Sequence, residues 1–186
     1  DIVFSLLGIL LSGLLQVAVA VLIKATSPGP VFFRQTRVGH MERNYQVIKF
    51  RTMRQDAESE SGAVWAQEND PRITPVGGIC RKLRLDELPQ FWNVLIGEMS
   101  FVGPRPERPE FVDKLKEKIP YYGERHTVKP GITGWAQVNY SYGASEEDAL
   151  RKLEYDLFYI KNLSMVFDIY IVLKTIKTVL FGEGAR

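Results

Sequence analysis

Two adjacent carboxylates, Asp86 and Glu87, are the residues of this 186-residue chain best suited to carry chemistry. Three cations precede them within the stretch 81–84, and Arg105 follows on a Gly-Pro-Arg-Pro turn. A carboxylate can attack an electrophile or bind a metal ion, and cations can hold anionic oxygens. The pattern therefore contains the parts that phosphoryl transfer needs.

These residues also have a structural explanation. Asp86 fits the N-cap of a helix, with Glu87 placed favourably for the helix dipole. A helix N-terminus also concentrates positive charge where a phosphate can sit, so the two explanations are compatible. Arg105 could form a surface salt bridge, but Pro104 and Pro106 stiffen the backbone around it, which favours oxyanion binding.

Four further charged residues allow two interpretations. Lys49 and Arg51 lie two residues apart in a predicted strand, so they point to the same face, where solvated cations are common. Asp156 and Asp168 each lie among apolar residues, and a buried pair with an arginine is the structural explanation. The two histidines have no neighbouring Cys or His, and the chain carries no zinc, P-loop or Rossmann signature.

An apolar run, Ile2–Ile23, stands near the beginning of the sequence and carries no formal charge. As a helix it would be about 33 Å long, enough to cross a hydrocarbon core. Ser12-Gly13 lies near its middle, and such a pair is a known site of helix kinking. Composition alone favours a straight span over a helix that enters the bilayer and returns. In either case the cations after Ile23 predict that this side faces the cytoplasm.

The rest of the chain predicts one α+β domain. Val31–Arg37 and Tyr45–Met53 indicate a β-hairpin, and the polar stretch Gln55–Asp70 indicates a loop or a frayed helix. Ser145 and Asp148 form an N-cap signature. Helices are expected over Thr74–Leu85, Leu88–Ile96, Pro109–Lys118, Glu146–Lys161 and from Ser164 to about Phe181, the last of them interfacial or in the core.

Composition narrows the class of protein. Basic and acidic residues number 24 and 22, so the overall charge does not indicate a nucleic-acid partner. Residues 1–54 hold seven basic and two acidic residues, an excess that anionic lipid headgroups would attract. A single cysteine, Cys80, excludes an internal disulfide and is compatible with the cytosol.

Five motifs follow one another along the chain: SPGPVFFRQ from Ser27, KFRTM from Lys49, LDELPQ from Leu85, MSFVGPRP from Met99 and KPGITGWAQVN from Lys129. Taken in this order, they resemble the bacterial sugar transferases, which are monotopic phosphoglycosyl transferases acting on polyprenol phosphate. The resemblance covers nearly the whole chain, and the segment after Asn139 is similar to the branch that initiates exopolysaccharide repeat units.

The resemblance implies a covalent mechanism. Asp86 would attack the β-phosphate of a UDP-sugar, UMP would leave, and polyprenol phosphate would then displace the sugar phosphate from the aspartate. Glu87 would be the partner of Asp86 in Mg²⁺ binding or proton handling. By motif, the candidate phosphate contacts are Lys49, Arg51, Arg81 and Arg105, the nucleotide loop is shaped by Pro104 and Pro106, and Asp156 and Asp168 are structural or metal-related.

The resemblance also implies a mostly helical α+β fold, with a re-entrant membrane helix over residues 1–27 and a catalytic domain over residues 28–186. In the family a Ser-Pro pair breaks this helix. Here Ser12-Gly13 takes that place, and because glycine can bend without proline we expect the re-entrant form. The expected location is the cytoplasmic face of the bacterial inner membrane, among its lipids, with a homodimer as a further possibility.

Two other functions remain open at this point. A hydrolase could use the same aspartyl intermediate and finish with water, releasing sugar phosphate. A catalytically silent, membrane-anchored module could instead dock polysaccharide assembly partners. No motif distinguishes the donor sugars, whose contacts we expect in the loops Gln55–Asp70 and Tyr140–Glu147.

Overall fold

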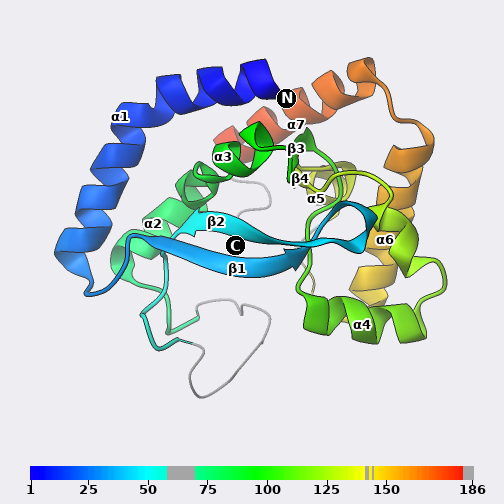
Figure 1. The fold of residues 1–186 in the computed structure, drawn as a ribbon, viewed down its shortest axis with the longest axis horizontal. Helices are drawn as coiled ribbons and strands as arrows, with labels where there is room; N and C mark the ends of the chain where they lie inside the picture. Colours follow the sequence, from blue (N-terminus) through cyan, green and yellow to red (C-terminus); the bar gives the residue numbers. More distant parts are fainter. Residues whose placement is uncertain (58–69, 141–142, 144, 182–186) are drawn as a thin grey trace.

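The computed structural model describes residues 1–57, 70–140, 143 and 145–181 (Figure 1). The fold is α+β and mostly helical, as predicted. Two small sheets lie among helices and short 3₁₀ turns. Most of the predicted loop Gln55–Asp70, and residues 141, 142 and 144 of the second predicted loop, lie outside the described residues.

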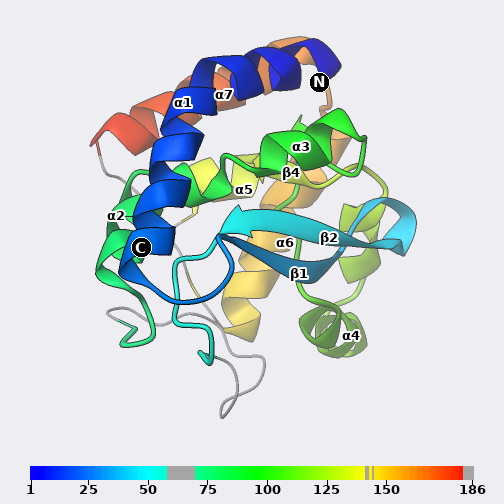
Figure 2. The same ribbon diagram turned by 60° about the vertical axis from the view of Figure 1, so that its left-hand side comes forward.

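Helix α1 (Ile2–Thr26) is long and apolar enough to cross a membrane. It is bent near its middle, so that it arches over the rest of the chain (Figures 1 and 2). Around this point the Ser12 hydroxyl donates to the Gly8 carbonyl at 2.5 Å, and Gln16 Nε2 donates to Ser12 Oγ at 2.9 Å. A serine that bonds back to the preceding turn often bends a helix, which gives the bend a local cause.

Both ends of α1 pack on the same domain. At its start, the Asp1 carboxylate accepts hydrogen bonds from Ser100 Oγ at 3.1 Å and from the Phe101 amide at 3.4 Å. Gly8 packs against Phe91 so closely that an added Cβ would lie 2.8 Å from the ring. Near its end, Val19 and Ile23 are buried in a cluster with Phe50 and Cys80.

The predicted hairpin is present as β1 (Phe32–Val38) and β2 (Asn44–Phe50), joined through the 3₁₀ turn η1 (His40–Glu42). The strands are antiparallel, with Phe32 opposite Phe50 and Val38 opposite Asn44. The second strand ends at Phe50, earlier than predicted. The prediction that Lys49 and Arg51 point to the same face of one strand is therefore wrong, because Arg51 lies beyond the end of the strand.

The second sheet was not predicted. Its strands β3 (Ser100–Val102) and β4 (Gly131–Thr133) are parallel, and each lies within one of the five motifs. The Gly/Pro-rich stretch from Lys129 to Trp135 therefore contains a strand, followed at once by the short helix α5 (Trp135–Asn139).

The predicted helices are all present; Pro109–Lys118 and Glu146–Lys161 have the predicted bounds, and the others differ at their ends. Helix α6 begins with the predicted cap, a capping box between Ser145 and Asp148. The remaining bounds are α2 (Pro75–Lys82), α3 (Gln90–Leu95), α4 (Pro109–Lys118), α6 (Glu146–Lys161) and α7 (Met165–Phe181), with 3₁₀ turns η2 (Leu85–Glu87) and η3 (Tyr122–His126).

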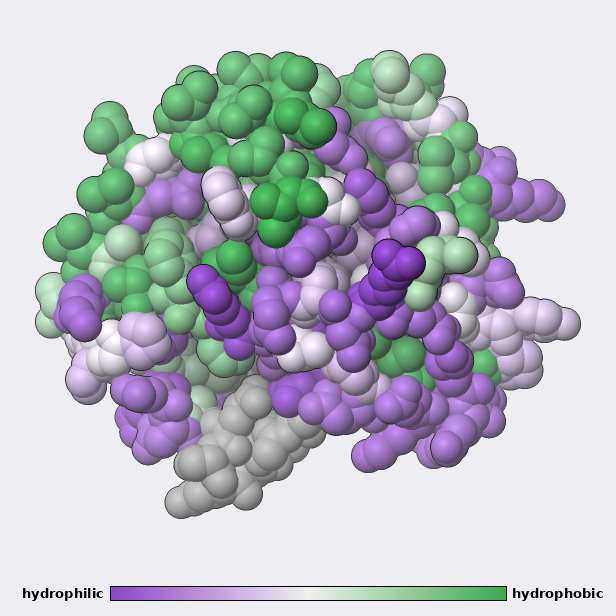
Figure 3. Space-filling model, viewed as in Figure 1, coloured by the Kyte–Doolittle hydropathy of each residue, from purple (hydrophilic) through white to green (hydrophobic). Residues whose placement is uncertain are grey.

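Apolar side chains gather on the outside of α1, whereas the opposite part of the same view is largely polar (Figure 3). Leu11 and Leu14 are 85% and 90% exposed, and on α7 Met165 and Val166 are 80% and 78% exposed. A patch of this extent marks an interaction surface rather than the ordinary surface of a soluble domain.

Candidate active site

The backbone around the two carboxylates is a tight turn between helices. Thr74 caps α2 by accepting from the Gly77 amide at 3.0 Å, and the chain leaves this helix through Arg84 in the left-handed region (φ 57°, ψ 19°). Asp86 and Glu87 then lie in the 3₁₀ turn η2, and both are buried. Helix α3 has Pro89 at its N-cap and no side-chain cap, so Asp86 does not have the capping role that the sequence allowed.

Glu87 is held by cations from three different segments. Its Oε1 lies 3.0 Å from Lys49 Nζ of β2 and 3.3 Å from both Nη1 and Nη2 of Arg105. Its Oε2 lies 3.6 Å from Arg84 Nη1. Burial acts to raise the pKa of Glu87, but Lys49, Arg105 and Arg84 together hold it well below the usual range. Glu87 is therefore a fixed anion.

Asp86 is in the opposite situation. Burial and then the charge of Glu87 raise its pKa, against the weaker opposing effect of Lys49, Arg81 and Arg105. Its side chain makes no hydrogen bond to another described residue. The turn thus pairs an anchored carboxylate with a more basic, unengaged one, an asymmetry typical of carboxylates with separate roles in catalysis.

The surrounding cations are themselves oriented. Arg81 Nε donates to Thr52 Oγ1 at 2.9 Å. Lys49 is half-buried, and the loss of solvent lowers the pKa of its ammonium, while Glu87 acts to raise it. A half-buried cation that faces a carboxylate across 3.0 Å is held in one place, as binding of an anionic group requires.

The Pro104–Pro106 loop that carries Arg105 is fixed through its carbonyl groups. The Pro104 carbonyl accepts from the Gly131 amide at 3.0 Å, and the Pro106 carbonyl accepts from Arg37 Nη1 at 3.0 Å. Between them, the Arg105 carbonyl accepts from Arg125 Nη2 at 2.9 Å. The loop therefore presents the Arg105 side chain from a rigid backbone.

Two predicted acidic candidates lie away from this cluster. Asp156 is buried and paired with Arg125, Oδ2 to Nη2 at 2.8 Å. Asp168 accepts from the Tyr159 hydroxyl at 2.8 Å. The first is the arginine pair that the sequence allowed, and it supports the site indirectly because Arg125 also bonds the Arg105 carbonyl.

Arg51 is also apart from Glu87. Its Nη2 donates to the Ser27 carbonyl at 2.8 Å, which ties the end of α1 to the domain. It is 5% exposed, and its Nε and Nη1 have no hydrogen-bond partner in the described part of the chain.

Several residues of the site were not singled out from the sequence. Arg84 was counted among the three cations before the carboxylates, and its i, i+3 spacing to Glu87 could have identified it as a partner of that residue. Asn93 had no such signal, yet it joins α3 to β2: its Oδ1 accepts from the Ile48 amide at 3.1 Å, and its Nδ2 donates to the Gln46 carbonyl at 2.8 Å. Arg37 and Arg125 likewise act through contacts that only the fold creates.

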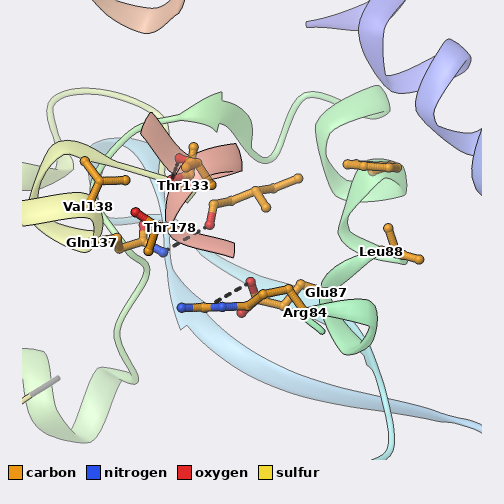
Figure 4. A pocket seen from close by; sticks show the side chains of 10 residues that line it. Arg84, Glu87, Leu88, Thr133, Gln137, Val138 and Thr178 are labelled. Atoms are coloured by element: carbon orange, nitrogen blue, oxygen red, sulfur yellow. Dashed lines mark hydrogen bonds and ion pairs between the residues drawn. The ribbon is translucent and has the colours of Figure 1, made fainter. Parts of the chain in front are cut away.

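A cavity of about 120 Å³ opens beside Glu87. Figure 4 shows Arg84 lying along Glu87 at one side of this cavity, with Thr133, Gln137 and Val138 across from them. The lining residues are Arg84, Glu87, Leu88, Phe91, Ile132, Thr133, Gln137, Val138, Thr175 and Thr178.

Across the described ranges, no group of three His, Cys, Asp or Glu side chains is placed to hold a metal ion. Magnesium is commonly bound by one or two carboxylates together with substrate phosphates. Asp86 beside Glu87 therefore fits a Mg²⁺ ion only when phosphate oxygens complete its shell.

Comparison with known proteins shows the family of the chain. The sequence model of the family described as "Bacterial sugar transferase" matches residues 1–182. The chain is 53% identical, over its full length, to UDP-N-acetylgalactosamine-undecaprenyl-phosphate N-acetylgalactosaminephosphotransferase of Aeromonas hydrophila, covering 44% of that protein. It is 46% identical over 95% of its length to UDP-glucose:undecaprenyl-phosphate glucose-1-phosphate transferase of Escherichia coli K12, covering 38% of it.

A shorter relative is matched almost end to end. It is the exopolysaccharide production protein PSS of Rhizobium leguminosarum bv. phaseoli, 41% identical over 99% of this chain and 95% of that protein. By contrast, the chain spans less than half the length of the Aeromonas and Escherichia relatives.

Proposed function

Since the chain belongs to the bacterial sugar transferase family, we propose that it transfers a sugar 1-phosphate from a UDP-sugar to undecaprenyl phosphate or a similar polyprenyl phosphate. The product would be a polyprenyl diphospho-sugar, the first membrane-bound intermediate of a polysaccharide. The relatives' names include N-acetylgalactosamine and glucose, so the donor sugar is left to measurement.

In the proposed first step, an Asp86 oxygen attacks the β-phosphorus of the donor. A P–O bond to the aspartate forms, the bond from that phosphorus to the bridging oxygen breaks, and UMP leaves with the electron pair. In the second step an oxygen of the polyprenyl phosphate attacks the same phosphorus and releases the carboxylate. Covalent catalysis allows a water-soluble donor and a lipid acceptor to use one site in turn.

The single observation that carries this proposal is the unequal environment of the two carboxylates. Asp86 is unengaged and more basic than an ordinary aspartate, as a nucleophile should be. Glu87 is held ionised by Lys49, Arg84 and Arg105, which favours an anchoring role over proton transfer. The cations that it positions would face the negative charge that develops as the diphosphate breaks.

For the donor phosphates we propose contacts from Lys49, Arg81 and Arg105. Arg51 is a further candidate through its unpartnered nitrogens at the α1 junction. Pro104 and Pro106 would hold the nucleotide loop. When bound, Mg²⁺ would neutralise phosphate charge, with Asp86 and Glu87 as the carboxylates available to it.

We place the domain at the cytoplasmic face of the inner membrane, with α1 re-entrant. Support comes from the bend of α1 and from the contact of Asp1 with Ser100, which returns the start of the helix to the catalytic domain. The exposed apolar residues of α1 and α7 would then lie in lipid. A homodimer stays a prediction.

The test uses the purified protein in detergent with a panel of UDP-sugars and no acceptor. We expect UMP release limited to about one equivalent, and a sugar-phosphate mass added to the peptide that contains Asp86. Asp86→Asn should abolish both, whereas Asp113→Asn, the same change on the exposed face of α4, should not.

Three outcomes would contradict the proposal. Absence of the adduct with every donor would exclude the covalent step. Steady release of sugar phosphate would favour the hydrolase. Absence of UMP with and without polyprenyl phosphate would favour a silent docking module.

A further inference from the structure

The walls of the cavity beside Glu87 carry few hydrogen-bonding groups that a polar ligand could use. Leu88, Phe91, Ile132 and Val138 form its apolar part. Its polar groups mostly satisfy one another or the backbone, so few of them are left for a ligand. The pairs are Thr133 Oγ1 with Thr175 Oγ1 at 2.7 Å, Thr175 Oγ1 with the Ile171 carbonyl at 2.8 Å, and Gln137 Nε2 with the Ile132 carbonyl at 3.1 Å.

One polar atom of the lining differs from the others. Gln137 Oε1 is buried without a hydrogen-bond partner among the described residues. A uracil or a sugar ring presents several donors and acceptors, and burying them against these walls would leave most of them unsatisfied. The cavity is therefore a poor site for the nucleotide or the sugar.

The opposite side of the cavity is charged. Arg84 and Glu87 close it there, next to Asp86 and to the cations Lys49 and Arg105. Asp86 itself does not line the cavity. The space is thus suited to the apolar group directly attached to a reacting phosphate, not to the phosphate itself.

The cavity also lies beneath a helix with an exposed apolar face. Thr175 and Thr178 of α7 line it, while Leu173 and Ile176 of the same helix are 61% and 51% exposed. With that face in lipid, as proposed above, α7 lies between the membrane and the cavity, so the cavity is close to the source of a lipid substrate.

We infer that this cavity binds the isoprene unit next to the phosphate of the polyprenyl acceptor. That phosphate would be directed toward Arg84 and toward the turn η2, which carries Asp86 and Glu87. The inference rests on the proposed function and names the subsite of its second substrate. The volume agrees: an engineered apolar cavity of about 150 Å³ holds benzene, and an isoprene unit has five carbons.

The kinetic test uses two substitutions that reduce the volume of the cavity, one on each of two lining helices. Val138→Phe on α5 and Thr178→Phe on α7 each add an aromatic ring to the lining, and Leu150→Phe adds one on the exposed surface of α6 as the control. For each variant, the donor-only burst of UMP and the transfer to undecaprenyl phosphate are measured on the same sample.

We expect both cavity variants to lower lipid transfer at least about tenfold relative to their own donor burst, because the buried isoprene contacts are lost. The control should keep the wild-type ratio. If both variants lose burst and transfer to the same extent, the inference is overturned in favour of a donor site. If both variants fold and keep the wild-type burst and the wild-type transfer, the cavity binds neither substrate and the inference is also overturned.

A second test does not depend on turnover. A short isoprenyl phosphate with a photoreactive diazirine on its first unit is irradiated with the wild-type protein in the absence of donor. We expect labelling of the peptides that contain Phe91, Val138 or Thr178, and suppression by excess undecaprenyl phosphate but not by UDP-sugar. Labelling elsewhere, or suppression by UDP-sugar alone, would overturn the inference.

The two proposals fail in different ways. If the wild-type protein releases no UMP from any donor, the proposed function fails whatever the labelling shows. If the donor burst is normal but the labelled peptides lie outside the cavity, only the acceptor subsite is wrong.

Discussion

Asp86 and Glu87 are neighbours in the sequence, but their surroundings push their pKa values in opposite directions. Three cations around Glu87 keep it ionised, and the resulting fixed charge is one of the causes that raise the pKa of Asp86. The anchored residue thus has two effects: it holds Lys49, Arg84 and Arg105 in place, and it makes the neighbouring carboxylate more basic. A more basic carboxylate is a better nucleophile as long as it stays ionised.

This coupling predicts the pH dependence of the donor half-reaction. Glu87→Gln removes the charge that raises the pKa of Asp86 and leaves the cations to act on Asp86 alone, so Asp86 should stay ionised to lower pH. The acid limb of the residual UMP burst should therefore move to lower pH than in the wild-type protein. Burst amplitude and rate against pH are the measurement.

Glu117→Gln, an exposed change on α4, is the matched control and should leave the acid limb in place. An acid limb in Glu87→Gln that stays or moves upward would show that the charge of Glu87 does not act on the nucleophile.

Among the secondary-structure elements, single buried side chains connect segments that lie far apart in the sequence. Asn93, fully buried on α3, bonds the backbone of β2 at Gln46 and Ile48, and also donates to Glu98 Oε2 at 2.6 Å. This connection sets the distance between the strand that carries Lys49 and the helix that follows the carboxylate turn.

Asn93→Ala should therefore lower the free energy of unfolding by about 1–3 kcal/mol, because buried partners lose their hydrogen bonds. Asn162→Ala removes the same group from an exposed helix end and should cost much less. Denaturant unfolding in detergent would measure both. Equal effects of the two variants would show that the α3–β2 connection does not limit stability.

The turn η3 contains a buried histidine that links stability to pH. Burial and the nearby Arg125 lower the pKa of His126 to about 4, against an ordinary value of 6.5. The unfolded chain takes up a proton below about pH 6.5, and the folded protein does so only near pH 4. His126 therefore destabilises the fold progressively as pH falls through this window, and contributes no pH dependence above it.

We expect His126→Gln to lose less stability than the wild-type protein between about pH 7 and about pH 5, by roughly 1–2 kcal/mol. The melting temperature at several pH values would test this. A parallel decline of the two proteins would show that other groups govern the acid sensitivity.

For the molecule as a whole, the bend of α1 decides where the start of this helix lies relative to the rest of the chain. A straight helix would carry Asp1 away from the domain, whereas here Asp1 contacts Ser100 and the helix arches over α3 (Figure 2). The apolar surface of α1 and α7 and the charged cluster then lie on one compact body. In the proposed reaction the donor comes from water and the acceptor from lipid.

This arrangement predicts the side on which the start of α1 is found. A cysteine inserted directly before Asp1 precedes the apolar helix, and Cys80 is buried, so labelling should report the introduced thiol. In inverted membrane vesicles, a membrane-impermeant maleimide should label this inserted cysteine as it labels Lys118→Cys on α4. In intact cells neither should react, and labelling of the inserted cysteine alone from outside would establish a straight span instead.

The sequence determined the features that depend on neighbours a few residues away. The apolar run of α1, the two strands of the hairpin and the Ser145–Asp148 capping box could all be predicted, because helix, strand and cap preferences act over short separations. The ordered motifs also identified the family, and with it Asp86 and Glu87 as candidates. The sequence alone also allowed Asp86 to be the N-cap of the following helix. The structure excludes this role, because Asp86 lies in the turn η2 and Pro89 is the N-cap of α3.

Which charged side chains from distant segments form ion pairs depends on the tertiary structure. Lys49 and Arg105 converge on Glu87, whereas Arg51 binds Ser27 and Asp156 pairs with Arg125. Nothing in the local sequence separates these cations, because each partner is set by how strands and helices pack. The cavity beside Glu87 arises in the same way, since α3, β4, α5 and α7 each contribute part of its wall.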